Sequence, residues 1–105
     1  MKFEKLLLLA GLSACIATPA LASMEIATKG GCTACHTVDK KLVGPAYKDV
    51  AAKYKTQADA MAPKLAEKVR KGGVGVWGPI PMPPNGPEKI NDADLKTAIA
   101  WVLKL

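Results

Sequence analysis

The sequence predicts an all-α fold built from short helices in a single domain. The chain has 105 residues, which leaves no room for a second domain. Near the C-terminus, Leu95, Ile99 and Val102 form an apolar stripe at helical spacing. No convincing pair of strands and no internal repeat is found. The proline-rich stretch 75–87 is the only segment that resembles a linker.

Three helices are expected before that stretch. The first covers Ser23–Lys29 and ends at Gly30-Gly31, where the missing side chains allow another backbone to approach closely. The second covers Lys48–Tyr54. The third covers Pro63–Lys71, with its proline in the first turn, where a missing N–H is tolerated, and with Gly72 as its terminator.

The last helix has the clearest signals. Asn91 is placed to cap its N-terminus, and Asp92 and Asp94 suit the positive end of the helix dipole. Lys104 is expected in the last turn, where a cation is favourable.

The first 22 residues predict an export signal. The basic start at Met1–Lys5 is followed by an apolar run that ends in the small-x-small pattern Ala20-Leu21-Ala22. The run is too short and too polar for a stable membrane span. We expect cleavage after Ala22, so that residues 1–22 are a signal peptide and residues 23–105 form a soluble periplasmic domain.

A second processing site overlaps this signal. Leu12-Ser13-Ala14-Cys15 matches a bacterial lipoprotein box, in which Cys15 would become the lipidated first residue. A form anchored to the membrane through Cys15 is therefore the alternative. Cleavage after Ala22 remains the expectation, because lipidation would leave a well-formed cleavage site without a purpose.

The composition favours a small domain that is stabilised by something bound. Two Trp, two Tyr and one Phe give modest material for a core, and small domains often need a disulfide, a metal or a cofactor. Fifteen basic and nine acidic side chains leave a formal charge of +6. This charge suits acidic protein partners, and the predicted export argues against nucleic acid.

The two cysteines of the predicted domain stand in Cys32-Thr33-Ala34-Cys35-His36, which contains the only histidine of the chain. This C-x-x-C-H pattern is typical of c-type haem attachment, because two thiols at this spacing can each add to one haem vinyl group. The imidazole that follows is then carried beneath the iron. A zinc site lacks further Cys or His ligands, a thioredoxin-like pair lacks its βαβ context, and a disulfide leaves His36 unexplained.

The second axial ligand of such a haem is expected to be Met82. It lies in a proline-rich loop, where fixed φ angles present one thioether without much loss of chain entropy. Met61 is instead interpreted as a residue that fills an apolar gap in a helix. Met24 lies too close to the expected N-terminus to be favoured.

These segments carry a resemblance to a known family. Besides the haem motif, they are VGPAYKDVAAK at 43–53, GVWGPIPMPPN at 75–85 and WVL at 101–103. The chain resembles the small bacterial class I cytochromes c, most closely the cytochrome c-551 group, over essentially all of residues 23–105. The resemblance implies the cytochrome c fold, with short helices wrapped around one covalently attached haem c and the last helix crossing the first near Gly31.

The resemblance also implies roles for residues around the iron ligands His36 and Met82. The Pro45 carbonyl would accept a hydrogen bond from His36 Nδ1, and Asn85 would donate its amide to the Met82 sulfur. The Trp77 indole N–H would bind a haem propionate. Lys68 would approach a propionate as well, although a solvated lysine explains that position equally well.

The implied function is that of a single-electron shuttle and not of an enzyme, because two axial ligands leave no open position on the iron. The alternatives are a haem peroxidase or gas-binding protein and a fixed subunit of a larger respiratory complex. The expected partners are redox proteins with acidic docking surfaces. A terminal reductase (such as nitrite reductase) or an oxidase would accept electrons, and a quinol-oxidising complex or another cytochrome would donate them. We expect a monomer.

Overall fold

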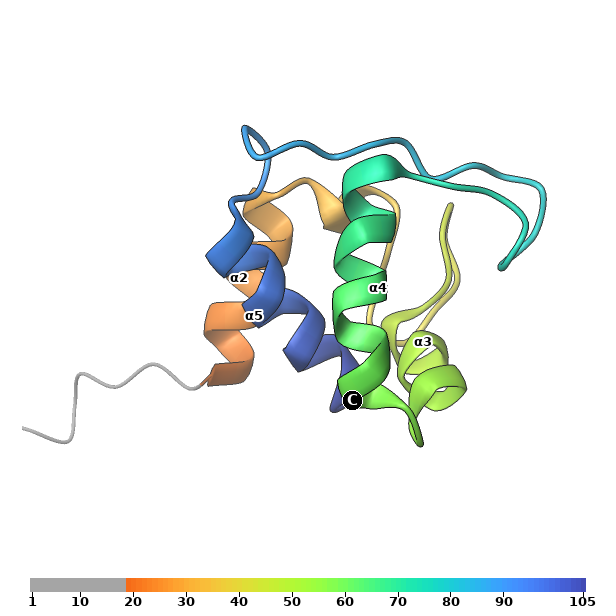
Figure 1. Ribbon diagram of the computed structural model, residues 1–105, viewed down its shortest axis with the longest axis horizontal. Helices are drawn as coiled ribbons and strands as arrows, with labels where there is room; N and C mark the ends of the chain where they lie inside the picture. The colour runs from red at the N-terminus through yellow and green to blue at the C-terminus, as the bar shows by residue number, and fades with distance from the viewer. Residues whose placement is uncertain (1–18) are drawn as a thin grey trace, which may run out of the picture.

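The computed structural model describes residues 19–105, which form a helical domain (Figure 1). The elements in chain order are α2 (Pro19–Lys29), the 3-10 helix η1 (Cys32–Ala34), α3 (Tyr47–Tyr54), α4 (Ala58–Lys71) and α5 (Asp92–Leu103). This part of the chain holds no strand, and its only bridge of the β type joins Gly73 to Met82. The all-α prediction is confirmed.

The predicted export signal lies almost entirely outside the described residues, and so does the lipoprotein box with Cys15. Helix α2 begins at Pro19, four residues before the expected start at Ser23. Within residues 19–105, no helix combines the length and the apolar character that crossing a membrane requires.

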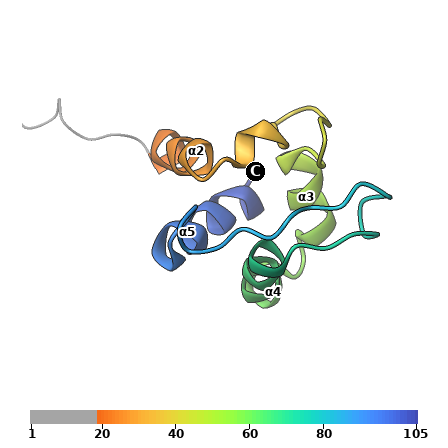
Figure 2. The ribbon, with the colours of Figure 1, turned by 90° about the horizontal axis from the view of Figure 1, so that it is seen from above.

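Within residues 19–105, helix α5 contacts the other three α-helices, α2, α3 and α4. Figures 1 and 2 show α2 on one side of it and α3 and α4 on the other. The long loop 72–91 leaves the end of α4, extends past α3 and returns across the molecule to the start of α5 (Figures 1 and 2). This loop is the segment that carries Met82.

The core is small and centres on α5. Its buried cluster consists of Ile90, Leu95, Ala98 and Ile99. Partly buried residues of α2 and α4 pack against it, among them Ile26, Ala62, Leu65, Ala66 and Val69. The apolar stripe predicted for the last helix thus faces the core, with its third member, Val102, half-buried beside a cavity.

The N-terminus of α5 is capped as predicted. The Asn91 side-chain oxygen accepts a hydrogen bond of 2.8 Å from the backbone N–H of Asp94. Lys104, however, follows the helix as its C-cap instead of lying in the last turn, and its backbone N–H bonds to the Trp101 carbonyl. The positive charge of Lys104 therefore lies one residue beyond the end of α5 and not within its last turn.

Helix α4 starts earlier than predicted. It begins at Ala58, so Pro63 lies inside the helix and not in its first turn. Proline removes one bond of the helical ladder, but Ala62 and Leu65 on either side of it pack against the core cluster and favour continuation. Helix α3 also starts one residue early, at Tyr47. The predicted end of α4 is confirmed, since Gly72 has a φ of 73°, which other residues rarely adopt.

The two glycines after α2 have different roles. A Cβ at Gly30 would lie 3.3 Å from Cβ of Ile90, so this residue allows the segment before α5 to approach α2. Gly31 has open space around it, but its φ is 80°. The close approach expected near Gly31 therefore occurs at Gly30, and Gly31 serves the turn.

Candidate functional site

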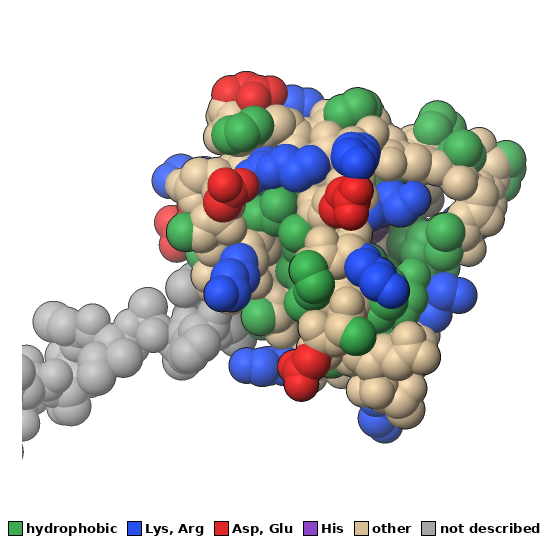
Figure 3. All heavy atoms as spheres, viewed as in Figure 1, with side chains coloured by type: hydrophobic (Ala, Val, Ile, Leu, Met, Phe, Trp, Pro, Cys, Tyr) green, Lys and Arg blue, Asp and Glu red, His purple; other side chains and the backbone are tan. Residues whose placement is uncertain are grey.

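A cavity of about 370 Å³ opens between α3, α4, the C-terminal part of α5 and loop 72–91. Its walls are mainly apolar, and Cys35, His36 and Met82 all line it. Hydrophobic side chains gather on the hollowed side of the molecule beneath the loop tip (Figure 3). The structure therefore brings three residues of two distant motifs to one apolar space.

The haem motif folds as a tight turn. The backbone N–H groups of Cys35 and His36 both bond to the carbonyl of Cys32, at 3.2 and 2.9 Å. The N–H of Gly44 bonds to the Cys35 carbonyl at 2.8 Å and joins the motif to the next segment. These bonds leave Cys35 and His36 on the wall of the same cavity.

The imidazole of His36 is oriented by a backbone contact. Its Nδ1 lies 2.8 Å from the Pro45 carbonyl oxygen. Because a carbonyl can only accept, Nδ1 carries the proton and the neutral ring keeps its lone pair on Nε2. That tautomer can bind a metal through Nε2, and the contact with the carbonyl fixes the orientation of the ring.

Two neighbours confine the same ring. A Cβ at Gly44 would lie 2.5 Å from Cε1 of His36, so only glycine fits there without a shift. The Tyr47 ring stacks on His36 at 5.2 Å between centroids, and Trp101 meets the edge of Tyr47 at 5.7 Å. Sequence reasoning missed these positioning roles, although both aromatic residues stand in segments typical of the family.

Cys32 and Cys35 are free thiols in this structure. Burial is the largest influence on the Cys32 thiol and raises its pKa. Burial also raises the pKa of Tyr47, with a further contribution from the nearby Cys32. In the described part of the chain, no three Cys, His, Asp or Glu side chains come together as a metal site.

Met82 reaches the cavity from loop 72–91. Its backbone N–H and carbonyl bond to Gly73, with N···O distances of 2.8 and 3.0 Å. A Cβ at Gly72 would lie 2.5 Å from the Met82 carbonyl oxygen, so the two segments touch through their backbones. Met61 of α4, expected to fill an apolar gap, also lines the cavity.

The predicted bond from Asn85 to the Met82 sulfur is not made. The Asn85 amide nitrogen instead donates to the carbonyl oxygens of Pro83 at 2.9 Å and Val69 at 3.4 Å. An amide has two N–H donors, and carbonyl oxygens are stronger acceptors than a thioether. In this structure Asn85 therefore ties the loop to α4, and its bond to the Met82 sulfur stays a prediction.

Trp77 and Lys68 lie on the cavity wall. The Trp77 ring is 40% exposed, and the ammonium of Lys53 lies 5.5 Å from its centroid. Lys68 packs against Gly73, where a Cβ would lie 2.6 Å from Nζ. Both side chains thus remain available at the edge of the site.

The residues present fit a haem. The cavity falls within the roughly 300–1,000 Å³ of typical ligand pockets and is mainly apolar. It presents one imidazole and thioethers, with a cysteine of the attachment motif on its wall. Imidazole and thioether are axial ligands of haem iron in cytochromes c.

Comparisons with known proteins agree with this fit. The family model described as Cytochrome c matches residues 22–105. Cytochrome c2 of Rubrivivax gelatinosus is 53% identical over 88 residues, covering 84% of this chain and 98% of that protein. Cytochrome c-551 of Allochromatium vinosum is 51% identical over 90 residues, covering 86% of this chain and 93% of its own length.

A solved structure supports the same conclusion. The crystal structure of wild-type Nitrosomonas europaea cytochrome c552 superposes with a TM-score of 0.72 at 50% identity, covering 78% of this chain and 98% of that one. The chain therefore belongs to the cytochrome c family, as a small class I member that carries one covalently attached haem c and transports electrons.

Proposed function

We propose that this protein is a periplasmic single-electron shuttle in which His36 and Met82 are the axial ligands of the haem iron. The observation that carries the proposal is that both side chains line one apolar cavity. Each is placed by backbone contacts, through Pro45 for His36 and through Gly73 for Met82. Positioning by backbone keeps the ligand geometry constant, which suits rapid electron transfer.

When bound, the haem iron supplies a one-electron couple. In the proposal, Cys32 and Cys35 would hold the group through thioether bonds, and His36 would bind the iron through Nε2. The soft thioether of Met82 would favour ferrous iron and raise the reduction potential. The apolar walls keep water away, which limits the solvent reorganisation that accompanies each transfer.

Two residues at the cavity edge are proposed to meet the haem propionates. The Trp77 indole N–H is a donor, and the Lys68 ammonium supplies an opposite charge. Both side chains line the cavity. Replacing Trp77 by Phe removes the donor and keeps an aromatic ring. The contact would be supported if the ferric absorption spectrum of Trp77→Phe stays unchanged over a narrower pH range than that of the wild type.

Replacement of Met82 tests the ligand assignment. Met82→Ala should abolish the near-infrared band of the methionine–iron bond and lower the reduction potential, since a soft ligand is lost. Met61→Ala is the matched control, because it removes the other thioether of the cavity wall. A band that survives in Met82→Ala and disappears in Met61→Ala would reassign the ligand.

The proposal excludes catalysis at the iron, because both axial positions are filled. A haem peroxidase or gas-binding protein is the alternative, and it requires an open position. Rapid binding of carbon monoxide by the native ferrous protein would favour that alternative. Co-purification at fixed stoichiometry with an oxidase or reductase would instead favour a fixed subunit of a larger complex.

The periplasmic location rests on the export signal at residues 1–22. We propose cleavage after Ala22 and a soluble product. The alternative is anchoring through an acylated Cys15. The intact mass of the native protein separates the two: a chain that starts at Ser23 and carries one haem supports the soluble form, whereas acylation at Cys15 contradicts it.

We propose acidic surfaces on the partner proteins. Lysines 53, 64 and 68 lie around the cavity, either on its wall or over Trp77. Lys and Arg are scattered over the face in Figure 3 among fewer Asp and Glu. The acceptor would be a terminal reductase or oxidase, and the donor a quinol-oxidising complex or another cytochrome. Association rates should then fall as salt increases.

A further inference from the structure

Loop 72–91, which carries Met82, is held by backbone bonds within itself and by contacts with α3, α4 and the core. Its base is held by the paired backbone bonds between Gly73 and Met82. Its outer part is held by Lys53 of α3, whose ammonium lies 5.5 Å from the Trp77 ring centroid. Its last third is held by the Arg70 side chain of α4, by bonds from Asn85 to the Val69 carbonyl and by the buried side chain of Ile90.

Arg70 makes three contacts with its guanidinium. Nη1 donates to the carbonyl oxygens of Asn85 at 3.2 Å and Ile90 at 2.7 Å. Nη2 donates to a carboxylate oxygen of Asp92 at 2.6 Å. The Arg70 side chain is only 21% exposed, whereas that of Asp92 is 93% exposed. The guanidinium therefore spans the segment between Asn85 and α5 from a partly buried position.

This contact lies close to Met82 along the chain. Pro83 and Pro84 separate Met82 from Asn85, and both have a fixed φ. The two prolines therefore restrict how far Asn85 can move independently of Met82. The backbone N–H of Asn85 also bonds to the Val69 carbonyl at 2.9 Å, next to Arg70 on α4.

We propose that Arg70 is a positioning residue that holds Met82 in its binding position by tying the end of its loop to α4 and α5. The inference rests on the proposed ligation by Met82. A planar guanidinium with donors in a fixed fork can bind two carbonyl oxygens and a carboxylate together. A lysine in its place would be a point charge and could satisfy fewer of these acceptors at once.

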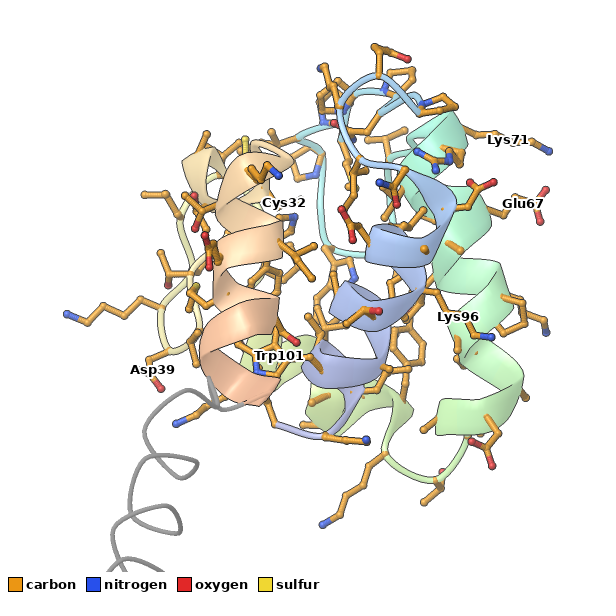
Figure 4. All side chains as sticks on the ribbon, turned by 90° about the vertical axis from the view of Figure 1, so that its left-hand side faces the viewer. Cys32, Asp39, Glu67, Lys71, Lys96 and Trp101 are labelled. Atoms are coloured by element: carbon orange, nitrogen blue, oxygen red, sulfur yellow. The ribbon has the colours of Figure 1, made fainter. Side chains whose placement is uncertain are left out.

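Lys71 provides a matched control for the loss of charge. It is the next residue of α4, its side chain is 73% exposed, and its ion pair is with Glu67 of the same helix. Figure 4 shows Glu67 and Lys71 projecting away from the domain. Lys71→Gln and Arg70→Gln remove the same charge, but only Arg70→Gln removes contacts with the loop.

The test measures how readily added imidazole displaces the methionine from the ferric haem protein. The near-infrared methionine–iron band is followed during the titration. Arg70→Gln should raise the apparent affinity for imidazole at least about tenfold, because bonds from a charged donor to the loop are lost. Lys71→Gln should change it by less than about threefold, as expected for an exposed pair. The apparent imidazole affinity of Arg70→Lys should lie between that of Arg70→Gln and that of the wild type.

A second variant separates the proposal from general loss of stability. Leu95→Val removes a buried methylene group from the core of α5, away from the cavity wall, and should lower the midpoint of denaturant unfolding without changing imidazole affinity in folded protein. If Leu95→Val raises that affinity as much as Arg70→Gln at equal unfolding stability, the proposal is wrong.

The outcomes also separate this inference from the proposed function. A wild-type protein without the near-infrared band contradicts ligation by methionine altogether. A wild-type protein with the band, in which Arg70→Gln and Lys71→Gln bind imidazole equally, contradicts only the role of Arg70.

Discussion

At His36, three neighbours meet one imidazole. The Pro45 carbonyl binds Nδ1, the Tyr47 ring stacks on one face, and Gly44 leaves the space that the ring edge occupies. Each contact comes from the segment 44–47, which lies a short distance along the chain from the haem motif. The orientation of the ring is therefore a local property of this part of the sequence.

Replacing Gly44 by Ala should displace the imidazole. The new Cβ would lie 2.5 Å from Cε1 of His36, well inside van der Waals contact. We expect unfolding stability to fall by about 1–3 kcal/mol, the usual effect of overpacking, with a changed haem absorption spectrum. Gly86→Ala is the control, since its Cβ would meet only the flexible end of Glu88. An unchanged spectrum and stability in Gly44→Ala would contradict the steric account.

The hydroxyl of Tyr47 is expected to make the free energy of unfolding depend on pH. Burial, the largest cause, raises its pKa above the ordinary value of 10.0. Above pH 10.0 the unfolded chain therefore holds fewer protons at this site than the folded one, so the free energy of unfolding falls as the pH rises. Below that pH the hydroxyl keeps its proton in both the folded and the unfolded state, so it does not make the free energy of unfolding change with pH.

Denaturant unfolding on both sides of pH 10.0 measures this effect. Tyr47→Phe should show a shallower alkaline decline than the wild type, because it has no hydroxyl proton to lose. Tyr54→Phe removes the other tyrosine and serves as the control. Identical slopes in wild type and Tyr47→Phe would exclude Tyr47 as the source.

Among the elements, α5 depends on its cap and α4 on its packing. Asn91 satisfies the N–H of Asp94 at the start of α5, a helix that contacts α2, α3 and α4. In α4 the helix continues through Pro63, because Ala62 and Leu65 are packed against α5. Local propensity decides the first case, and tertiary contact decides the second.

Removing the cap should destabilise the domain as a unit. Asn91→Ala should lower the free energy of unfolding by about 0.5–2 kcal/mol, seen as a lower thermal midpoint by circular dichroism. Asn91→Asp keeps an acceptor and should retain most of the stability. If Asn91→Ala has the same thermal midpoint as the wild type, the stability of α5 depends on packing alone and not on its cap.

At the scale of the whole molecule, the domain has little core without its cofactor. Its buried cluster consists of Ile90, Leu95, Ala98 and Ile99, while α3, α4 and loop 72–91 surround the cavity. The side chains on the cavity wall gain their contacts from whatever fills it. The haem is therefore expected to act as part of the core.

A chain that cannot attach haem should lose its cooperative fold. The double variant Cys32→Ala and Cys35→Ala should show a much weaker helical circular dichroism signal and no sharp unfolding transition, as small domains without their staple do. Met82→Ala is the control, because it keeps both thioether attachments and should remain folded. A sharp transition in the double variant would show that the polypeptide core suffices.

The sequence by itself determined the features whose physics is local. The haem motif, the proline-rich loop, the cap at Asn91 and the terminator at Gly72 each depend on residues within a few positions of one another. Spacing along the chain, fixed φ angles and a side-chain oxygen at a helix start act over that range. These predictions could therefore be made without knowing the packing.

Only the tertiary structure decided the features that join distant segments. The amide of Asn85 bonds to Val69, Arg70 binds the carbonyl of Ile90, and Gly30 makes room for the segment before α5. In each case the acceptor or the space is supplied by a different element, so no pattern along the chain identifies it. Hydrogen bonds and close packing are made with whichever groups the fold brings within reach, and that neighbourhood exists only once α5 lies between α2 and α4.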